Sequence, residues 1–339
     1  MTKKGNSILI GWMSGVLMAA VLALPGSAQA QTCLTASDMD DATREALVRA
    51  ASNDFDLLSR GDAAALKQAS STSLASDFSS IEGLVQENRA NLSQASASPR
   101  PPFLLKAEKP GATAAASVEF LCGVFGARGQ TANSAEFVIP NLPAGSYGIV
   151  MLDAAAKTPV TATFVLLQQN AAWKLAGLYV KASQTAGHDA AWFAEKARAY
   201  KAKGQTHNAW LYFLEARDLA LPVQFMSTQM SDKLYDESQA LKPPDFPDPN
   251  PAELASGSTK YEISALFPTA VGDDLDLVVK YQCADVSNTA QTFQTNQAVI
   301  KALLAKYPEF RDAFSGVVAR AVEPSGKDYG SLISMKDIK

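Results

Sequence analysis

The spacing of apolar residues predicts helices in the first part of the chain. From 38 to 92 these residues recur every three or four positions, which is typical of amphipathic helices. In the first helix the apolar positions are Val48, Ala51, Phe55 and Leu58. Gly61 can end this helix in a left-handed conformation, and Asp62 can accept N–H groups at the start of the next one. The sequence therefore predicts several consecutive helices before residue 93.

After residue 102 the pattern changes to one that is typical of strands. Five runs rich in β-branched and aromatic residues are separated by turn-forming Gly, Pro, Asn and Asp. The runs are AASVEFLCGVF (115–125), AEFVIP (135–140), GSYGIVMLD (145–153), VTATFVLLQQ (160–169) and WKLAGLYVKA (173–182). Because the helices precede a series of strand hairpins, we predict an α+β domain with N-terminal helices on an antiparallel sheet.

Residues 191–222 predict two helices hinged at Gly204, followed by a further helical segment up to Ala240. The two helices carry more apolar side chains than one helix pair can bury by itself. The excess includes Trp192, Trp210, Leu211 and Leu214. These residues predict either an exposed partner-binding site or a packed seam against the N-terminal domain and the following helix. The short tether at 183–189 favours the packed seam.

Five prolines between 243 and 251 prevent a helix and favour an extended, solvated path, so we predict a Pro-rich linker over 242–258. Beyond it, YEISALF and LDLVVKYQC predict strands, and an amphipathic helix ends at Pro308. Two more strand-like runs follow, so 259–339 reads as a small α+β domain. On this view residues 31–241 unfold as one unit, and the C-terminal domain is separable.

The first thirty residues predict an export signal. Lys3 and Lys4 precede an apolar run, and a small-residue site ends at Ala30. We expect cleavage before Gln31, no stable membrane span after processing, and a periplasmic or secreted protein. Thr32 stands where a lipoprotein signal requires Gly or Ala before its cysteine, so we do not expect lipidation at Cys33.

Two segments together resemble the NTF2-like (cystatin-like) fold, in which a curved sheet wraps around N-terminal helices. They are FDLLSRGDAAALKQ (55–68) and FVLLQQNAAWKLAGLYVKA (164–182). The resemblance covers 31–185 and implies an apolar pocket between sheet and helices. The segment FVIPNLPAGSYGIVMLD (137–153) alone resembles a turn of immunoglobulin-like β domains, which leaves a second interpretation of this part open.

The helical region 186–241 contains a second resemblance. Small and aromatic residues fall near the positions of a single tetratricopeptide repeat. They are Phe193, Ala197, Tyr200, Gly204, Ala209, Phe213, Ala216 and Pro222. Only one repeat is visible, whereas about three are needed to form an independent solenoid, so this hairpin must pack against another domain. The resemblance implies a protein-binding module.

Charge and residue supply exclude several functions. The net charge is −4 and no basic cluster is present, which argues against binding nucleic acid or anionic lipid. His188 and His207 are the only histidines, and both lie outside the predicted NTF2-like domain. A Ser-His-Asp or Cys-His catalyst inside that domain is therefore excluded, as is a His-rich metal site. We predict no cofactor, no metal and no catalytic set.

The three cysteines leave the disulfide state open. Cys33, Cys122 and Cys283 are too few and too scattered for a disulfide scaffold. Cys122 and Cys283 can be buried thiols in strands. Alternatively, export to an oxidising compartment allows a bridge between Cys33 and Cys122.

The leading interpretation is a non-catalytic exported protein that binds or assembles with other proteins, such as a partner in the cell envelope. The alternative is a small-molecule binder or proton-transfer enzyme that uses an apolar NTF2-like pocket. Its acid and tyrosine would come from Asp54, Glu119, Tyr147 or Tyr179. Such a base needs burial to raise its pKa toward neutrality.

Overall fold

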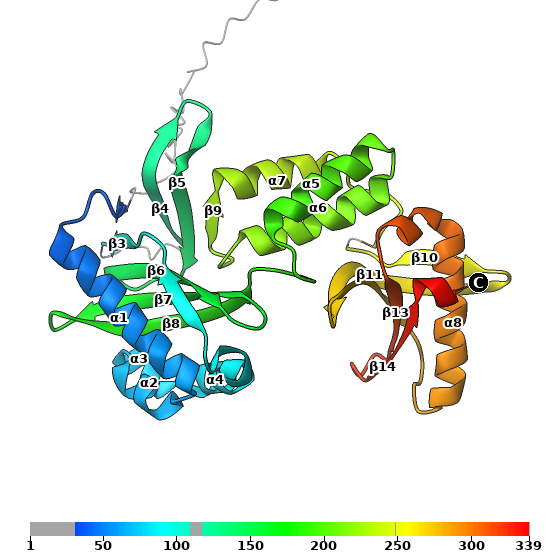
Figure 1. The fold of residues 1–339 in the computed structure, drawn as a ribbon, viewed down its shortest axis with the longest axis horizontal. Helices are drawn as coiled ribbons and strands as arrows, with labels where there is room; N and C mark the ends of the chain where they lie inside the picture. Colours follow the sequence, from blue (N-terminus) through cyan, green and yellow to red (C-terminus); the bar gives the residue numbers. More distant parts are fainter. Residues whose placement is uncertain (1–30, 109–116, 248, 339) are drawn as a thin grey trace, which may run out of the picture.

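The computed structural model describes residues 31–108, 117–247 and 249–338. The predicted export signal lies outside these residues. The described part combines helices with sheets of mostly antiparallel strands, which confirms the predicted α+β class (Figure 1). Within these ranges no helix is both long and apolar enough to cross a membrane.

A six-stranded antiparallel sheet forms the centre of the N-terminal part. Five of its strands lie in the order β1-β3-β6-β7-β8, and β2 pairs with β6 off this path. Their bounds are β1 Thr32–Leu34, β2 Ser96–Pro99, β3 Phe103–Ala107, β6 Gly145–Ala155, β7 Val160–Gln169 and β8 Ala172–Ala182. The last three match predicted strands, whereas β1, β2 and β3 fall in segments for which no strand was expected.

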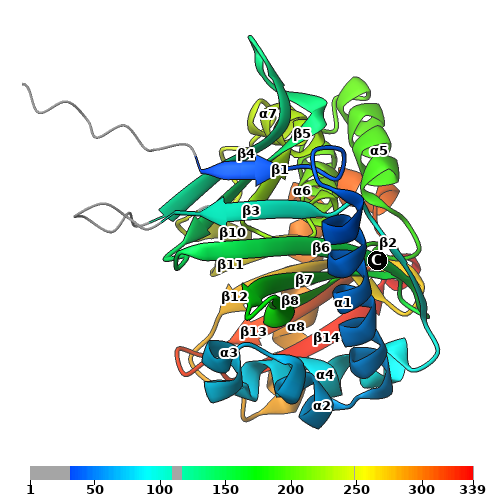
Figure 2. The same cartoon turned by 90° about the vertical axis from the view of Figure 1, so that its left-hand side faces the viewer.

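Four helices cover one face of this sheet. They are α1 Asp41–Arg60, α2 Ala63–Ala69, α3 Thr72–Ser76 and α4 Ser79–Leu92. Figure 2 shows α1 lying across the strands, and its buried side chains form a core with β6, β7 and β8. The predicted break is confirmed: Gly61 adopts φ 72° after α1, and the side chain of Asp62 accepts the N–H of Ala65.

Two long strands outside this sheet form an arm. The arm consists of β4 Ser117–Gly126 and β5 Gly129–Pro140, which projects from the body of the molecule (Figure 1). The short strand β9, Met226–Thr228, extends this pair to a separate three-stranded sheet. The sequence predicted the arm strands, but their membership of a second sheet was not expected. β9 comes from the helical region and so ties that region to the arm.

The predicted helical hairpin is formed by α5 Ala190–Ala202 and α6 Thr206–Ala220, with Gly204 at φ 75° in the turn. A third helix, α7 Gln229–Gln239, follows β9. The apolar side chains of the hairpin belong to one core with those of the C-terminal sheet. Toward the N-terminal sheet the hairpin makes polar contacts, including the ion pair of Lys181 Nζ with Asp218 Oδ1 at 2.9 Å. We expected the hairpin to pack against the N-terminal domain and the following helix. Its apolar side chains pack with Leu234 of that helix, α7, and with the C-terminal sheet instead of the N-terminal sheet.

The C-terminal part is a five-stranded sheet in the order β10-β11-β12-β13-β14. Its strands are β10 Ala252–Ser256, β11 Thr259–Val271, β12 Asp274–Gln282, β13 Gly316–Val322 and β14 Asp328–Ser334. β12 and β13 are parallel, because α8 Thr289–Lys306 and the short 3-10 helix η1 Pro308–Asp312 connect them. A second 3-10 turn, η2 Met335–Asp337, ends the described chain. Figure 1 shows α8 against one face of this sheet.

The Pro-rich segment differs from the solvated linker that was expected over 242–258. Its last residues form β10, which pairs with β11. Upstream of β10, the ring of Phe246 lies 5.0 Å from the ring of His207, and Tyr307 donates a hydrogen bond to Asp245. The prolines do prevent a helix, but side chains between them hold the segment against the hairpin and the C-terminal domain.

Candidate functional site

A groove of about 740 Å³ lies between the arm and the six-stranded sheet. We call it the arm groove. Apolar side chains on its wall and floor are Phe103, Val124, Ala135, Met151 and Met226. Its polar rim includes Thr35, Ser37, Asp38, Arg100, Asn133, Ser134 and Thr228. The lining thus comes from β3, β4, β5, β6, β9 and the two loops that follow β1 and β2.

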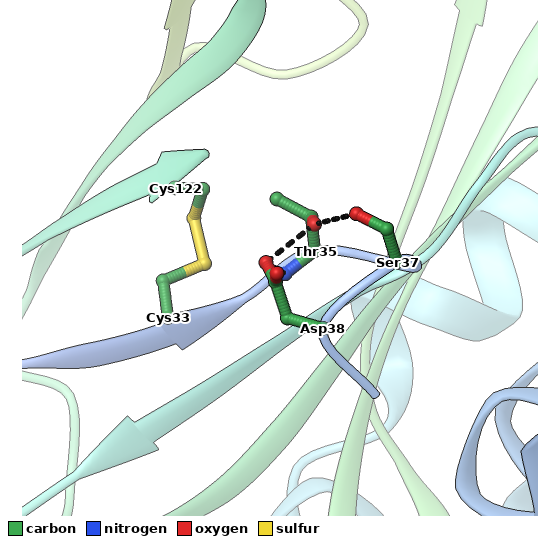
Figure 3. The surroundings of a disulfide bond; sticks show 5 residues. All are labelled: Cys33, Thr35, Ser37, Asp38 and Cys122. Atoms are coloured by element: carbon green, nitrogen blue, oxygen red, sulfur yellow. Dashed lines mark hydrogen bonds between the residues drawn. A yellow bond between two sulfur atoms is a disulfide. The ribbon is translucent and has the colours of Figure 1, made fainter. Parts of the chain in front are cut away.

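A disulfide fixes the arm beside the groove. Cys33 of β1 is bonded to Cys122 of β4, and the two Cα atoms are 5.1 Å apart (Figure 3). This settles the alternatives left by the sequence in favour of the bridge, while Cys283 is a half-buried free thiol. Gly123 follows the bridge with φ 83°, and a Cβ atom there would lie 2.1 Å from the carbonyl oxygen of Asn133. Only glycine therefore permits this close approach of β4 and β5 at the groove wall.

A tight turn at 35–38 forms one rim of the groove (Figure 3). The hydroxyl of Thr35 donates to Asp38 Oδ2 at 2.6 Å, and the Thr35 N–H donates to the same oxygen at 3.0 Å. These hydrogen bonds lower the pKa of Asp38. An aspartate with a lowered pKa is ionised at neutral pH and is a weak base, so this carboxylate acts as a hydrogen-bond acceptor rather than a proton acceptor.

Arg100 forms the opposite rim and also lines a second hollow of about 550 Å³. Its Nε and Nη2 donate to the two oxygens of Asp153 at 2.8 and 2.7 Å. Burial opposes ionisation of Asp153, but the hydrogen bonds from Arg100 and Thr161 outweigh it and lower its pKa. The guanidinium is held by this bidentate pair. Arg100 therefore marks the boundary between two adjoining hollows.

The lining of the arm groove has the character of a binding cleft. Asp38 and Arg100 are the charged residues that line the arm groove, and each is already held by hydrogen bonds. Among the described residues, no group of three or more His, Cys, Asp or Glu side chains could hold a metal ion. An apolar floor with a polar rim is the usual character of a ligand-binding cleft.

The residues singled out on the hairpin lie in the core that it shares with the C-terminal sheet. Leu211 is fully buried and Trp210 nearly so, while Trp192 and Leu214 are partly buried against the same core. Trp192 stacks on His188 with 3.6 Å between ring centroids. Trp210 and Leu214 also line a hollow of about 330 Å³ beside Phe246. The structure thus gives these four residues packing contacts within the chain.

The four residues considered for proton transfer are not brought together. Asp54 lies on α1, which covers one face of the six-stranded sheet, whereas Tyr147 belongs to the core on the opposite face. Glu119 is exposed on β4 of the arm. Tyr179 is exposed on β8 and contacts the ring of Phe225 at 5.4 Å. The structure thus distributes these four residues over α1, β4, β6 and β8.

Asp54 nevertheless has a shifted pKa. It is only 6% exposed, and burial raises its pKa to about 7, while Lys174 opposes part of the shift. Its neighbours on α1, Ala51, Phe55 and Leu58, belong to the core between the helices and the six-stranded sheet. This carboxyl therefore lies beside packed apolar side chains.

Sequence reasoning missed the arm groove and its lining. Phe103, Met151 and Met226 come from three strands of two sheets, so no local pattern connects them. The one available signal is the Arg100-Pro101-Pro102 stretch, which lies between the predicted helices and the predicted strands. Prolines there keep the rim extended beside β3.

Comparisons with known proteins give no relative for this chain. It matches no protein-family model, no curated protein and no solved structure.

Proposed function

We propose that this protein is a non-catalytic, exported binding module whose arm groove holds an apolar segment of a partner polypeptide. The observation that carries the proposal is the groove itself: about 740 Å³, lined by Phe103, Met151 and Met226 and by a polar rim that includes Asp38 and Arg100. Methionine side chains adapt their shape to different apolar partners, which favours binding of a polypeptide side chain over a rigid ligand.

The second hollow supports an extended ligand. It adjoins the arm groove at Arg100 and continues past Lys181 to the start of α5 and the end of α6. Arg100 uses Nε and Nη2 for Asp153 and Thr161, and its Nη1 has no hydrogen-bond partner among the described residues. This N–H group can donate to a main-chain carbonyl of a ligand that passes from one hollow into the other.

The proposal includes an NTF2-like N-terminal domain and a tetratricopeptide-like hairpin. Helices α1 to α4 on one face of an antiparallel sheet support an NTF2-like N-terminal domain. The α5–α6 pair with a glycine turn supports a tetratricopeptide-like hairpin. In this proposal the hairpin has a supporting role, because its apolar side chains stabilise the C-terminal sheet.

The competing proposal, proton transfer by Asp54, has one favourable observation, the raised pKa of this carboxyl. A catalytic acid or base must reach a substrate atom within hydrogen-bond distance. Asp54 is enclosed by the α1 core, so we favour binding at the arm groove.

A site-specific cross-linking experiment tests the proposal. A photoreactive residue replaces Val124, which is 64% exposed at the groove, and a matched one replaces Phe293, which is 40% exposed on α8. With envelope extract of the source cells, we expect a discrete protein adduct at position 124 and none of the same mass at position 293. Adding Ala132→Trp, which fills the groove from an exposed lining position, should abolish that adduct.

A control variant, Ala90→Trp, places the same bulk on exposed α4 away from the groove and should leave the adduct unchanged. Equal adduct yields with Ala132→Trp and Ala90→Trp would contradict a partner site in the arm groove.

A further inference from the structure

The outer face of the arm, opposite the groove core, combines apolar and acidic side chains. Phe120, Cys122, Ala135 and Phe137 point into the core, so the alternating residues lie on the other face. There Glu119 pairs with Val138, and Leu121 pairs with Glu136. Leu121 is 45% and Val138 42% exposed. We call these four residues the outer arm face.

Negative charge on the outer arm face is not neutralised within the chain. Asp232 of α7 lies near Glu136, and none of Glu119, Glu136 and Asp232 forms an ion pair with a described residue. Burial raises the pKa of Glu136, and the neighbouring carboxylates Glu119 and Asp232 raise it further. Gln130 Nε2 donates a hydrogen bond to Asp232 Oδ2 at 2.9 Å, which leaves the negative charge in place. The cluster thus offers acceptors to a cationic donor.

The C-terminal sheet has a face of matching character. Its core residues face α8 and the hairpin, and strand register places Phe267, Val278, Val318 and Leu332 on the opposite face. These four side chains form one row across β11, β12, β13 and β14. This face is open at the two ends of the row, whereas Val278 in the middle is only 5% exposed. Phe267 is 36% and Leu332 48% exposed, so the ends of the row are accessible.

A basic row runs beside this apolar row. Lys280 and Arg320 are register partners, two residues from Val278 and Val318 on the same face. Arg320 pairs with Asp328, whereas Lys280 forms no ion pair with a described residue and lies 5.4 Å above the ring of Phe267. Phe267 also lines a hollow of about 540 Å³, together with Glu215 and Asp218. The carboxylate of Glu215 already accepts a hydrogen bond from Thr185, and that of Asp218 accepts one from Lys181.

We infer that the outer arm face of one molecule docks on the open face of the C-terminal sheet of a second copy. Leu121 and Val138 would contact Phe267 and Leu332, and Lys280 would meet the carboxylates of Glu119 and Glu136. The arm projects from the body and can reach another molecule (Figure 1). Because the two surfaces differ, the contact is heterologous and produces either a closed ring or a chain of molecules.

Charge reversal with rescue tests this contact. The protein from Gln31 onward is followed by sedimentation velocity over a range of concentrations. Wild type should increase in mass with concentration, and added salt should weaken the association. Glu119→Lys and Lys280→Glu alone should each weaken self-association by about tenfold or more, because each places like charges across the contact. The double variant Glu119→Lys with Lys280→Glu should restore it.

Both substituted residues lie on the protein surface, and circular dichroism with thermal unfolding verifies that each variant folds. A wild-type protein that remains monomeric at every concentration overturns the inference. So do single variants that associate like wild type, or a folded double variant without rescue. Ala132→Trp should leave self-association unchanged, which separates this contact from ligand binding in the arm groove.

Discussion

Asp245 Oδ1 lies 3.1 Å from His207 Nε2, which joins the Pro-rich segment to the helical hairpin. On the other side of the ring, His207 Nδ1 lies 2.7 Å from Glu309 Oε1 of the C-terminal domain. Tyr307 donates to Asp245 Oδ2 at 2.8 Å. Burial opposes ionisation of Asp245, but the hydrogen bonds from Tyr307 and His207 prevail and lower its pKa. We call His207, Asp245, Tyr307 and Glu309 the latch. The latch connects the helical hairpin, the Pro-rich segment and the C-terminal domain, which the sequence predicted as separate segments.

Removing the imidazole should release the Pro-rich segment. We expect His207→Ala to lower the free energy of unfolding by about 1–2 kcal/mol, because two carboxylates lose a hydrogen-bond partner. Limited proteolysis should then cut earlier between 242 and 251. His188→Ala is the matched control, since His188 stacks on Trp192 and does not contact this segment. Unchanged cleavage in His207→Ala would show that the prolines and Phe246 hold the segment without the latch.

The stability of the N-terminal part should depend on Asp54 and on pH. The pKa of Asp54 rises from an ordinary 3.8 to about 7 on folding, so between these values the folded state binds more protons than the unfolded state. The contribution of Asp54 to the free energy of unfolding is therefore greatest below about pH 4, and this contribution is lost as the pH rises through 7. The shift corresponds to a loss on the order of 4 kcal/mol.

Asp54→Asn should remove this dependence, so that the variant gains stability relative to wild type as pH rises from 5 to 8. Urea unfolding at both pH values gives the comparison. Asp56→Asn, an exposed change on the same helix, should follow the wild-type pH profile. A parallel profile for Asp54→Asn would mean that another group titrates in this range.

The period of apolar residues was sufficient to predict the helices and most strands, because both depend on local spacing. Gly61 and Asp62 acted as expected at the end of α1 and the start of α2. The surroundings of the hairpin could not be predicted, since an excess of apolar residues such as Trp210 and Leu211 does not specify which surface will bury it. β9 has three residues, which are too few to show an alternation of apolar and polar side chains, although this strand pairs with the arm and helps to place it. The arm groove depends on that placement.

The disulfide should make a large contribution to stability. It joins β1 to β4 across a sequence separation of 89 residues, and closing a loop of this size restricts the unfolded chain. In a Cys283→Ser background, Cys33→Ser with Cys122→Ser should lower the free energy of unfolding by about 2–5 kcal/mol. Cys283→Ser alone should have little effect, because its thiol is free. Denaturant unfolding measures both, and a loss confined to Cys283→Ser would contradict this assignment.

The approach of α1 to the sheet depends on the absence of a side chain at Gly148 of β6. A Cβ atom at this position would lie 2.1 Å from Leu47 Cδ2, far inside van der Waals contact, and Leu47 is fully buried. Gly148→Ala should therefore destabilise the protein by about 1–3 kcal/mol, because the core must move to accept an extra methyl group. Leu47→Ala should cost about 2–5 kcal/mol through the cavity that it leaves. In the double variant the new methyl enters that cavity, so the combined loss should be smaller than the sum of the two single losses.

Gly83→Ala on α4 meets no atom within 4 Å and should stabilise the helix by about 0.5–1 kcal/mol, which controls for the effect of adding a methyl group to a glycine. Urea unfolding of the four variants gives the coupling energy, and strict additivity of Gly148→Ala and Leu47→Ala would show that α1 does not rest on β6 at this point.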